Sequence, residues 1–182
     1  MEKSGAGPAA SADFALDDSG DATAAVLKLD KSLCGRFDLR PLLAVYPAIK
    51  AGSATAEEEL VSCSFSYAKD APERLSGWMN ISDRKSARLA RFTVRGLFVG
   101  EGEEDRNPEV LADFAQPAFV VARRSKPDAN YHSVSYNLYA QADSLTVDFF
   151  FIVESASPLP PNDKLRPAVL DAARNTLLRV TG

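Results

Sequence analysis

Histidine and cysteine are scarce in this sequence, whose 182 residues include one His and two Cys. Cys34 and Cys63 are too few for the disulfide framework of a small secreted domain, and two thiols without neighbouring histidines make no zinc site. His132 has no second histidine with which to hold a metal ion. The sequence also lacks a P-loop, a dinucleotide-binding glycine motif and a G-x-S-x-G elbow. We therefore predict no metal and no cofactor, and no motif names a reaction.

Long apolar runs are also missing. No stretch approaches the roughly 20 apolar residues that span a bilayer, and the N-terminus lacks the basic start and apolar segment of a secretory signal. These absences predict a cytoplasmic protein that does not insert into a membrane.

An excess of acidic over basic residues is found only in the first 25 residues. They hold five acids and one base, which leaves residues 26–182 with 20 acids (25 minus 5) and 20 bases (21 minus 1). The same 25 residues contain little apolar surface, which predicts a disordered acidic tail followed by a single domain over residues 26–182. Because that domain is formally neutral, we do not expect a nucleic-acid partner.

Strands dominate the middle of the chain. Every second residue is apolar in five stretches, which is typical of strands with one buried face. The expected strands are residues 60–67, 74–82, 87–99, 132–141 and 145–153. The first two form a hairpin, and a short link joins the last two in a second one. Cys63 lies among the apolar residues of the first strand, which predicts a core position.

Three helices are expected around this sheet. A short one lies in residues 38–46, with Asp38 as its N-cap. A second one follows strand three at residues 108–116, where Asn107 caps the helix and Pro108 occupies its first turn. The stretch 162–180 predicts a longer amphipathic C-terminal helix. The fold class is therefore α+β, with a mainly antiparallel five-stranded sheet.

An acidic loop precedes the second expected helix. Acidic and amide side chains alternate from Glu101 to Glu109, as do the oxygen ligands of a calcium loop. Arg106 and Ala112 stand where that loop needs a Gly and a bidentate Glu. We therefore predict a solvated loop at residues 101–109.

The expected strands carry large apolar side chains on both faces. Phe150 and Ile152 alternate with Phe149 and Phe151, so the two pairs face opposite ways. Such a second apolar face needs a covering helix, an oligomer interface or an apolar partner. The candidates for apolar contact are Trp78, Tyr139, Phe150 and Ile152.

Basic residues cluster next to the third expected strand. They are Arg84, Lys85, Arg88, Arg91 and Arg95. The simplest interpretation is a solvated sheet face that discourages edge pairing, although an acidic partner would also fit it.

One segment resembles a known family. The strand pattern FTVRGLFV, the acidic loop and the following PEVLADFA, within residues 92–119, are similar to a segment of SecB-like export chaperones. The resemblance implies an ATP-independent holdase that assembles into a tetramer and binds unfolded preproteins, or a labile partner, along apolar grooves.

Three functions remain open. The leading one is non-enzymatic, chaperone-like binding of unfolded or apolar polypeptide by a homo-oligomer. An alternative is a small-molecule-binding or enzymatic fold, with a pocket lined by Phe92, Tyr136 and Phe149 and with His132 or Asp148 as acid or base. The third is a structural subunit of a larger assembly.

Overall fold

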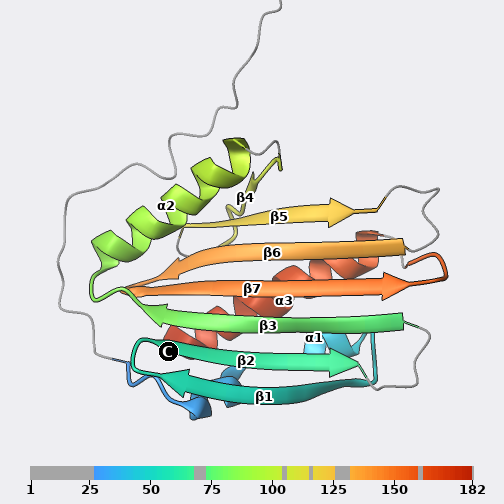
Figure 1. The fold of residues 1–182 in the computed structure, drawn as a ribbon, viewed down its shortest axis with the longest axis horizontal. Coiled ribbons are helices and arrows are strands. Elements are labelled where there is room, and N and C mark those ends of the chain that lie inside the picture. Colours follow the sequence, from blue (N-terminus) through green and yellow to red (C-terminus); the bar gives the residue numbers. More distant parts are fainter. Residues whose placement is uncertain are drawn as a thin grey trace, which may run out of the picture.

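A seven-stranded antiparallel sheet forms the centre of the protein (Figure 1). The computed structural model describes residues 27–67, 73–103, 106–114, 117–125, 132–159 and 162–181, so the acidic tail predicted for residues 1–25 lies outside the described residues. The strands are β1 Ile49–Glu57, β2 Leu60–Tyr67, β3 Glu73–Asp83, β4 Glu109–Val110, β5 Ala118–Arg124, β6 His132–Ala142 and β7 Leu145–Ser155. The helices are η1 Lys31–Arg36, α1 Arg40–Leu43, α2 Ala87–Glu103 and α3 Asn162–Thr181. The strand order is β1-β2-β3-β7-β6-β5-β4.

The α+β class is confirmed, but the prediction of five strands is wrong because the sheet has seven. β1 was missed because it is an edge strand of small residues with almost no apolar alternation. β5 was missed because Ala118–Val121 is buried on both faces, so its apolar residues run continuously. The hairpins β2–β3 and β6–β7 are where the sequence placed them.

The third predicted strand, residues 87–99, is instead the helix α2. Ala90 and Val94 are both buried, and a spacing of four residues places two side chains on one face in a strand as well as in a helix. Phe92 distinguishes the two structures, because a strand would bury it with its neighbours and it is 63% exposed. The Ser86 hydroxyl accepts a hydrogen bond from the Leu89 amide (3.2 Å) and so caps the first turn.

The predicted helix at residues 108–116 is also wrong. β4 occupies Glu109–Val110 and pairs with β5, and a turn follows at residues 112–114. Asn107 has a φ of 48° and therefore does not have the extended backbone of an N-cap. The order strand, loop, helix that carried the resemblance to SecB-like chaperones is not the order of elements in residues 92–119.

One face of the sheet packs against η1, α1 and α3, which lie behind the sheet in Figure 1. We call this the α3 face. The amphipathic C-terminal helix is confirmed, since α3 buries Leu165, Val169 and Ala172 there. Tyr136 and Phe149 are fully buried in the same core.

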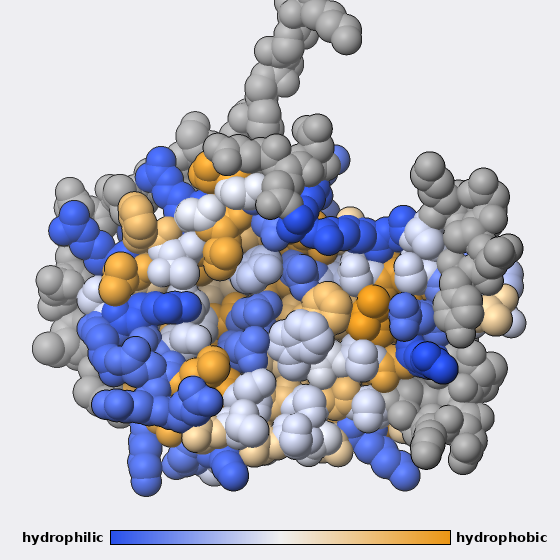
Figure 2. Space-filling model, in the orientation of Figure 1, coloured by the Kyte–Doolittle hydropathy of each residue, from blue (hydrophilic) through white to orange (hydrophobic). Residues whose placement is uncertain are grey.

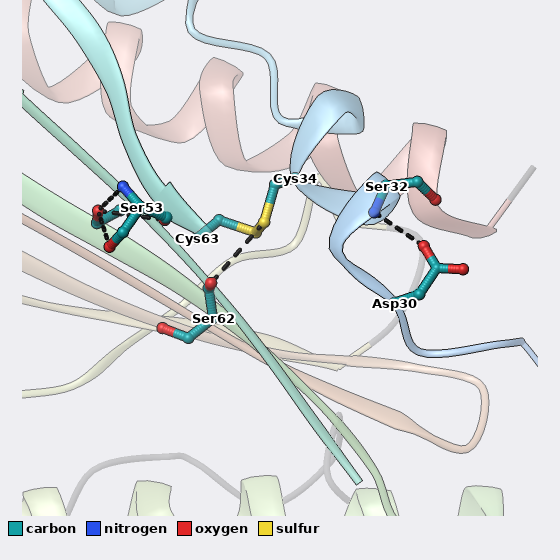
Figure 3. The surroundings of a disulfide bond; sticks show 7 residues. Asp30, Ser32, Cys34, Ser53, Ser62 and Cys63 are labelled. Atoms are coloured by element: carbon teal, nitrogen blue, oxygen red, sulfur yellow. Dashed lines mark hydrogen bonds between the residues drawn. A yellow bond between two sulfur atoms is a disulfide. The ribbon is translucent and has the colours of Figure 1, made fainter. Parts of the chain in front are cut away.

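A disulfide between Cys34 and Cys63 ties η1 to β2 (Figure 3). Cys63 is buried, as its place in the apolar pattern predicted. No pattern in the sequence pairs the two cysteines, because the 28 residues between them carry no signal that η1 returns to β2. At the start of η1, the Asp30 carboxylate accepts a hydrogen bond from the Ser32 amide (2.8 Å).

A buried carboxylate joins α1 to α3. Asp38 is 1% exposed and forms ion pairs with Arg40 (2.8 Å) and Arg179 (3.2 Å). Its backbone amide donates to the hydroxyl of Thr176 (2.9 Å). The side-chain hydrogen bond from Arg40 holds the pKa of Asp38 at about 2, against the opposing effect of burial. Asp38 does not cap α1 as expected, because Leu39 is the N-cap residue, but it accepts a hydrogen bond from the Arg40 amide (3.2 Å).

The opposite face of the sheet, which we call the α2 face, is only partly covered. α2 packs on this face against β5 and β6, at the left-hand side of the sheet in Figure 1, and Val94 packs there on Phe119 and Val121. Among the elements that the structure describes, no helix lies in front of β2, β3 and much of β7 (Figure 1). The second apolar face predicted from the sequence is therefore covered at one side and open at the other.

Candidate binding face

The open part of the α2 face carries a stacked aromatic pair. Trp78 on β3 lies directly opposite Phe150 on β7 in the strand register, and their ring centroids are 4.1 Å apart. Trp78 is 39% exposed, whereas Phe150 and the next residue on this face of β7, Ile152, are half-buried. We call these three residues the aromatic platform. Three of the four predicted contact residues thus lie together.

The fourth predicted residue, Tyr139, has a different environment. Its ring stacks on Phe119 with centroids 5.0 Å apart, in the small cluster that α2 covers. Burial raises its pKa, and the nearby charges of Asp148 and Glu101 act in the same direction. Tyr139 therefore belongs to the packing of α2 and lies beside the platform rather than on it.

Short polar side chains surround the platform. By strand register, Ser64 lies opposite Trp78, Asn137 lies opposite Phe150, and Ile152 lies between Ser76 and Ser135. Figure 2 shows the result: pale, orange and blue side chains lie next to one another in the middle of this face, and further blue ones lie toward its rim. Sequence alternation placed these polar residues on the platform's face but did not mark them as its neighbours.

Asp148 is the acidic residue next to the platform. It lies on the α2 face of β7 between Asn80 and Tyr139. Burial raises its pKa above the usual value, and the hydrogen bond from Asn80 Nδ2 (3.3 Å) offsets only part of that rise. The ionised carboxylate is therefore held in an unfavourable position, two residues from Phe150.

Replacing Asp148 with Asn is expected to stabilise the protein at pH 7. A carboxyl whose pKa is raised by folding contributes most to stability below its unfolded pKa of about 3.9, and that contribution is lost as the pH rises through the folded pKa. Asp148→Asn should therefore raise the free energy of unfolding at pH 7 and give no gain below about pH 4. Urea denaturation at the two pH values, followed by fluorescence of the single tryptophan, measures this.

The control is Asp143→Asn, in the exposed β6–β7 turn, which should leave stability unchanged. Equal stabilisation by Asp148→Asn at both pH values would show that removal of the buried charge is not the cause.

The residues of the expected pocket do not come together. Phe92 is exposed on α2, whereas Tyr136 and Phe149 are buried on the α3 face. His132 pairs with Ser155 near one end of β6, and Asp148 is opposite Tyr139, seven residues further along that strand, or roughly 23 Å at 3.3 Å per residue. His132 borders a surface hollow with Arg124 and Pro158, away from the platform. The two proposed acid–base residues therefore cannot act on one substrate atom.

Glu101 and Glu109, the two acidic residues of loop 101–109 whose side chains the structure describes, form ion pairs. Glu101 is buried and pairs with Arg106 (3.1 Å) and Arg123 (3.5 Å), and Glu109 pairs with Arg166. In the described ranges, no group of three or more His, Cys, Asp or Glu residues is placed to hold a metal ion. In the same ranges, no helix is both long and apolar enough to cross a bilayer.

Comparison with known proteins gives little. No protein-family model matches this chain, and no curated protein matches it. Among solved structures, the extracellular domain of PknH from Mycobacterium tuberculosis is similar over 85% of this chain and 98% of its own, with 11% sequence identity and a TM-score of 0.43. A likeness of this size carries no inference about function.

Proposed function

We propose that this protein binds apolar polypeptide segments without catalysing a reaction, in the manner of a holdase chaperone. The proposal depends on one observation, the Trp78–Phe150 pair that lies open on the α2 face. A large aromatic side chain within a polar surround is the usual arrangement at the centre of a protein interface, where tryptophan often contributes most of the binding free energy.

The polar surround favours a polypeptide partner. Serine hydroxyls and asparagine amides both donate and accept hydrogen bonds, so they can pair with the backbone of a bound segment. The apolar side chains of that segment would contact Trp78, Phe150 and Ile152. This role agrees with the function implied by the resemblance to SecB-like chaperones, which stays a prediction, and the proposal rests on the platform.

A homo-oligomer stays a prediction. β1 is a nine-residue strand at the edge of the sheet, and its outer side has no strand partner in the described part of the chain. Such an edge can pair with a second copy, although the register shift between Ala51 and Ala54 makes it less regular. An oligomer would present several platforms to one client and so increase its apparent affinity. Size-exclusion chromatography with light scattering measures the oligomeric state.

The cellular compartment of the protein is also a proposal. The cytoplasmic location expected from the sequence stays a prediction, and the Cys34–Cys63 disulfide argues against it. Disulfides form and persist in oxidising environments and are rare in the cytosol. We therefore propose that the protein works where this bond is kept oxidised.

The test is suppression of client aggregation. At a near-stoichiometric ratio and without nucleotide, the wild-type protein should reduce the light scattering of an unfolding client. Trp78→Ser should raise the concentration needed for half-suppression by about tenfold, because loss of an interface hot spot costs 1–2 kcal/mol or more.

Leu178→Ser is the matched control, since Leu178 is also exposed (60%) but lies on α3, on the other side of the sheet. It should leave suppression unchanged. A folded wild-type protein that does not suppress aggregation would overturn the proposal for general clients. An equal loss in both variants would show that the platform is not the contact surface.

A further inference from the structure

The outer side of α2 exposes an apolar stripe that packing on the sheet does not need. The helix is already anchored by Ala90 and Val94, which are buried against the sheet. Of the six large apolar side chains exposed in the described residues, four are on α2, and these are Leu89, Phe92, Leu97 and Val99. Phe92 is the most exposed, at 63%. Exposed apolar side chains gathered on one element indicate an interaction site.

The stripe has a helical spacing. Leu89, Phe92, Gly96 and Val99 are separated by three, four and three residues, so they lie along one side of the helix. A side chain placed at Gly96 or Gly100 would meet nothing within 4 Å. Because these two glycines have no side chain, the surface of the stripe is lower there, and another backbone can approach the helix closely.

The edge of this stripe is basic. Arg88 and Arg95 lie on one side of it, and both are exposed. Neither forms an ion pair with another described residue. Arg91, between them on the helix, donates a hydrogen bond to Gln141 (3.4 Å). The first acid of α2 is Glu101, which is buried and paired with Arg106 and Arg123. The outer face of α2 therefore fits an apolar segment that carries negative charge.

We propose that this face binds the chain's own N-terminal segment, Asp13–Asp21. Its sequence, DFALDDSGD, combines two large apolar residues, Phe14 and Leu16, with four acids. The apolar pair matches the Leu89–Phe92–Val99 stripe, and the acids match Arg88 and Arg95. The first 25 residues carry a net charge of −4, from five acids and one base, so the charge complementarity is local and strong.

The segment can reach α2. Leu27, the first described residue, is eleven positions after Leu16, and a chain of that length spans up to about 36 Å when extended. The 17 residues of α2 are about 26 Å long. Figure 1 places the start of the described chain and the first turn of α2 at the same end of the sheet. In the bound state the segment shields the apolar stripe and leaves the aromatic platform open, so this inference is independent of the proposed function.

A spin label tests the contact in the full-length protein. The label is attached through Ser11→Cys, whose thiol is free while Cys34 and Cys63 stay bonded, and amide signals of the isotope-labelled protein are recorded by NMR. A tether supplies an effective concentration on the order of 1 mM, so even weak docking populates the bound state. We expect the signals of Leu89–Val99 to lose more than about half of their intensity, with those of β1 unchanged.

Two double variants, each combining a pair of substitutions, identify the contacts. Phe14→Ser with Leu16→Ser, and separately Arg88→Glu with Arg95→Glu, should each restore most of the lost intensity. No loss of intensity on α2, or a loss that both pairs leave intact, overturns the proposal. A loss that appears only when spin-labelled, isotope-unlabelled protein is mixed with isotope-labelled protein also overturns it, because the occupant is then a second copy's segment.

Discussion

Replacing Cys34 and Cys63 together with Ser should lower the free energy of unfolding by about 3–4 kcal/mol. The bond closes a loop of about 30 residues, and the entropy that this closure removes from the unfolded chain corresponds to that amount. Small domains are stable by only about 5–15 kcal/mol, so the loss is a large fraction of the total. Urea denaturation followed by Trp78 fluorescence measures it, with the slope compared to confirm that both proteins unfold in the same way.

Reduction of the disulfide with a thiol reagent supplies the control for this prediction. Reduced wild-type protein should match the double variant, and the same agent should have no effect on the variant. A thiol count of two in denatured, unreduced wild-type protein would show that the bond is absent. It would also remove the reason for proposing an oxidising compartment.

Gly77→Ala should destabilise the protein by about 3 kcal/mol, since overpacking a core commonly costs 1–3 kcal/mol and here two groups must move. A Cβ at Gly77 would lie 2.2 Å from Cζ of Phe65 and 2.4 Å from the backbone oxygen of Phe150. Phe65 cannot easily yield, because its ring contacts those of Phe37 (5.2 Å) and Phe151 (6.2 Å). The Phe150 oxygen belongs to the strand next to β3, so moving it disturbs the sheet.

The matched control is Gly96→Ala, where the added Cβ meets nothing within 4 Å. Ala favours a helix over Gly, so this variant should gain about 0.5–1 kcal/mol. Thermal or urea unfolding of the two variants should therefore move in opposite directions. If Gly77→Ala is as stable as the wild type, then Phe65 has space to shift and β3 is not packed as tightly as its contacts indicate.

The spacing of apolar residues along the sequence was enough to predict some of the helices and strands. β2, β3, β6 and β7 have their apolar residues at every second position, and α3 repeats them at helical spacing, so each pattern has one interpretation. In α2, the buried positions Ala90 and Val94 fit the repeat of a strand as well as that of a helix. The residue that distinguishes a helix from a strand is Phe92, which is exposed to solvent. Only the packing of α2 on β5 and β6 decides that, because burial of Val94 on Phe119 and Val121 is a long-range contact.

The candidate site shows the same division. Alternation along the strands was sufficient to place Trp78, Phe150 and Ile152 on the face opposite Met79, Phe149 and Phe151. It could not say which face would be covered. That depends on how the helices pack: among the described elements, η1, α1 and α3 lie on one face and α2 lies on the other. The order of the strands then brought Trp78 against Phe150, and the return of η1 to β2 brought Cys34 to Cys63, because contacts between distant segments depend on the whole fold and leave no local pattern.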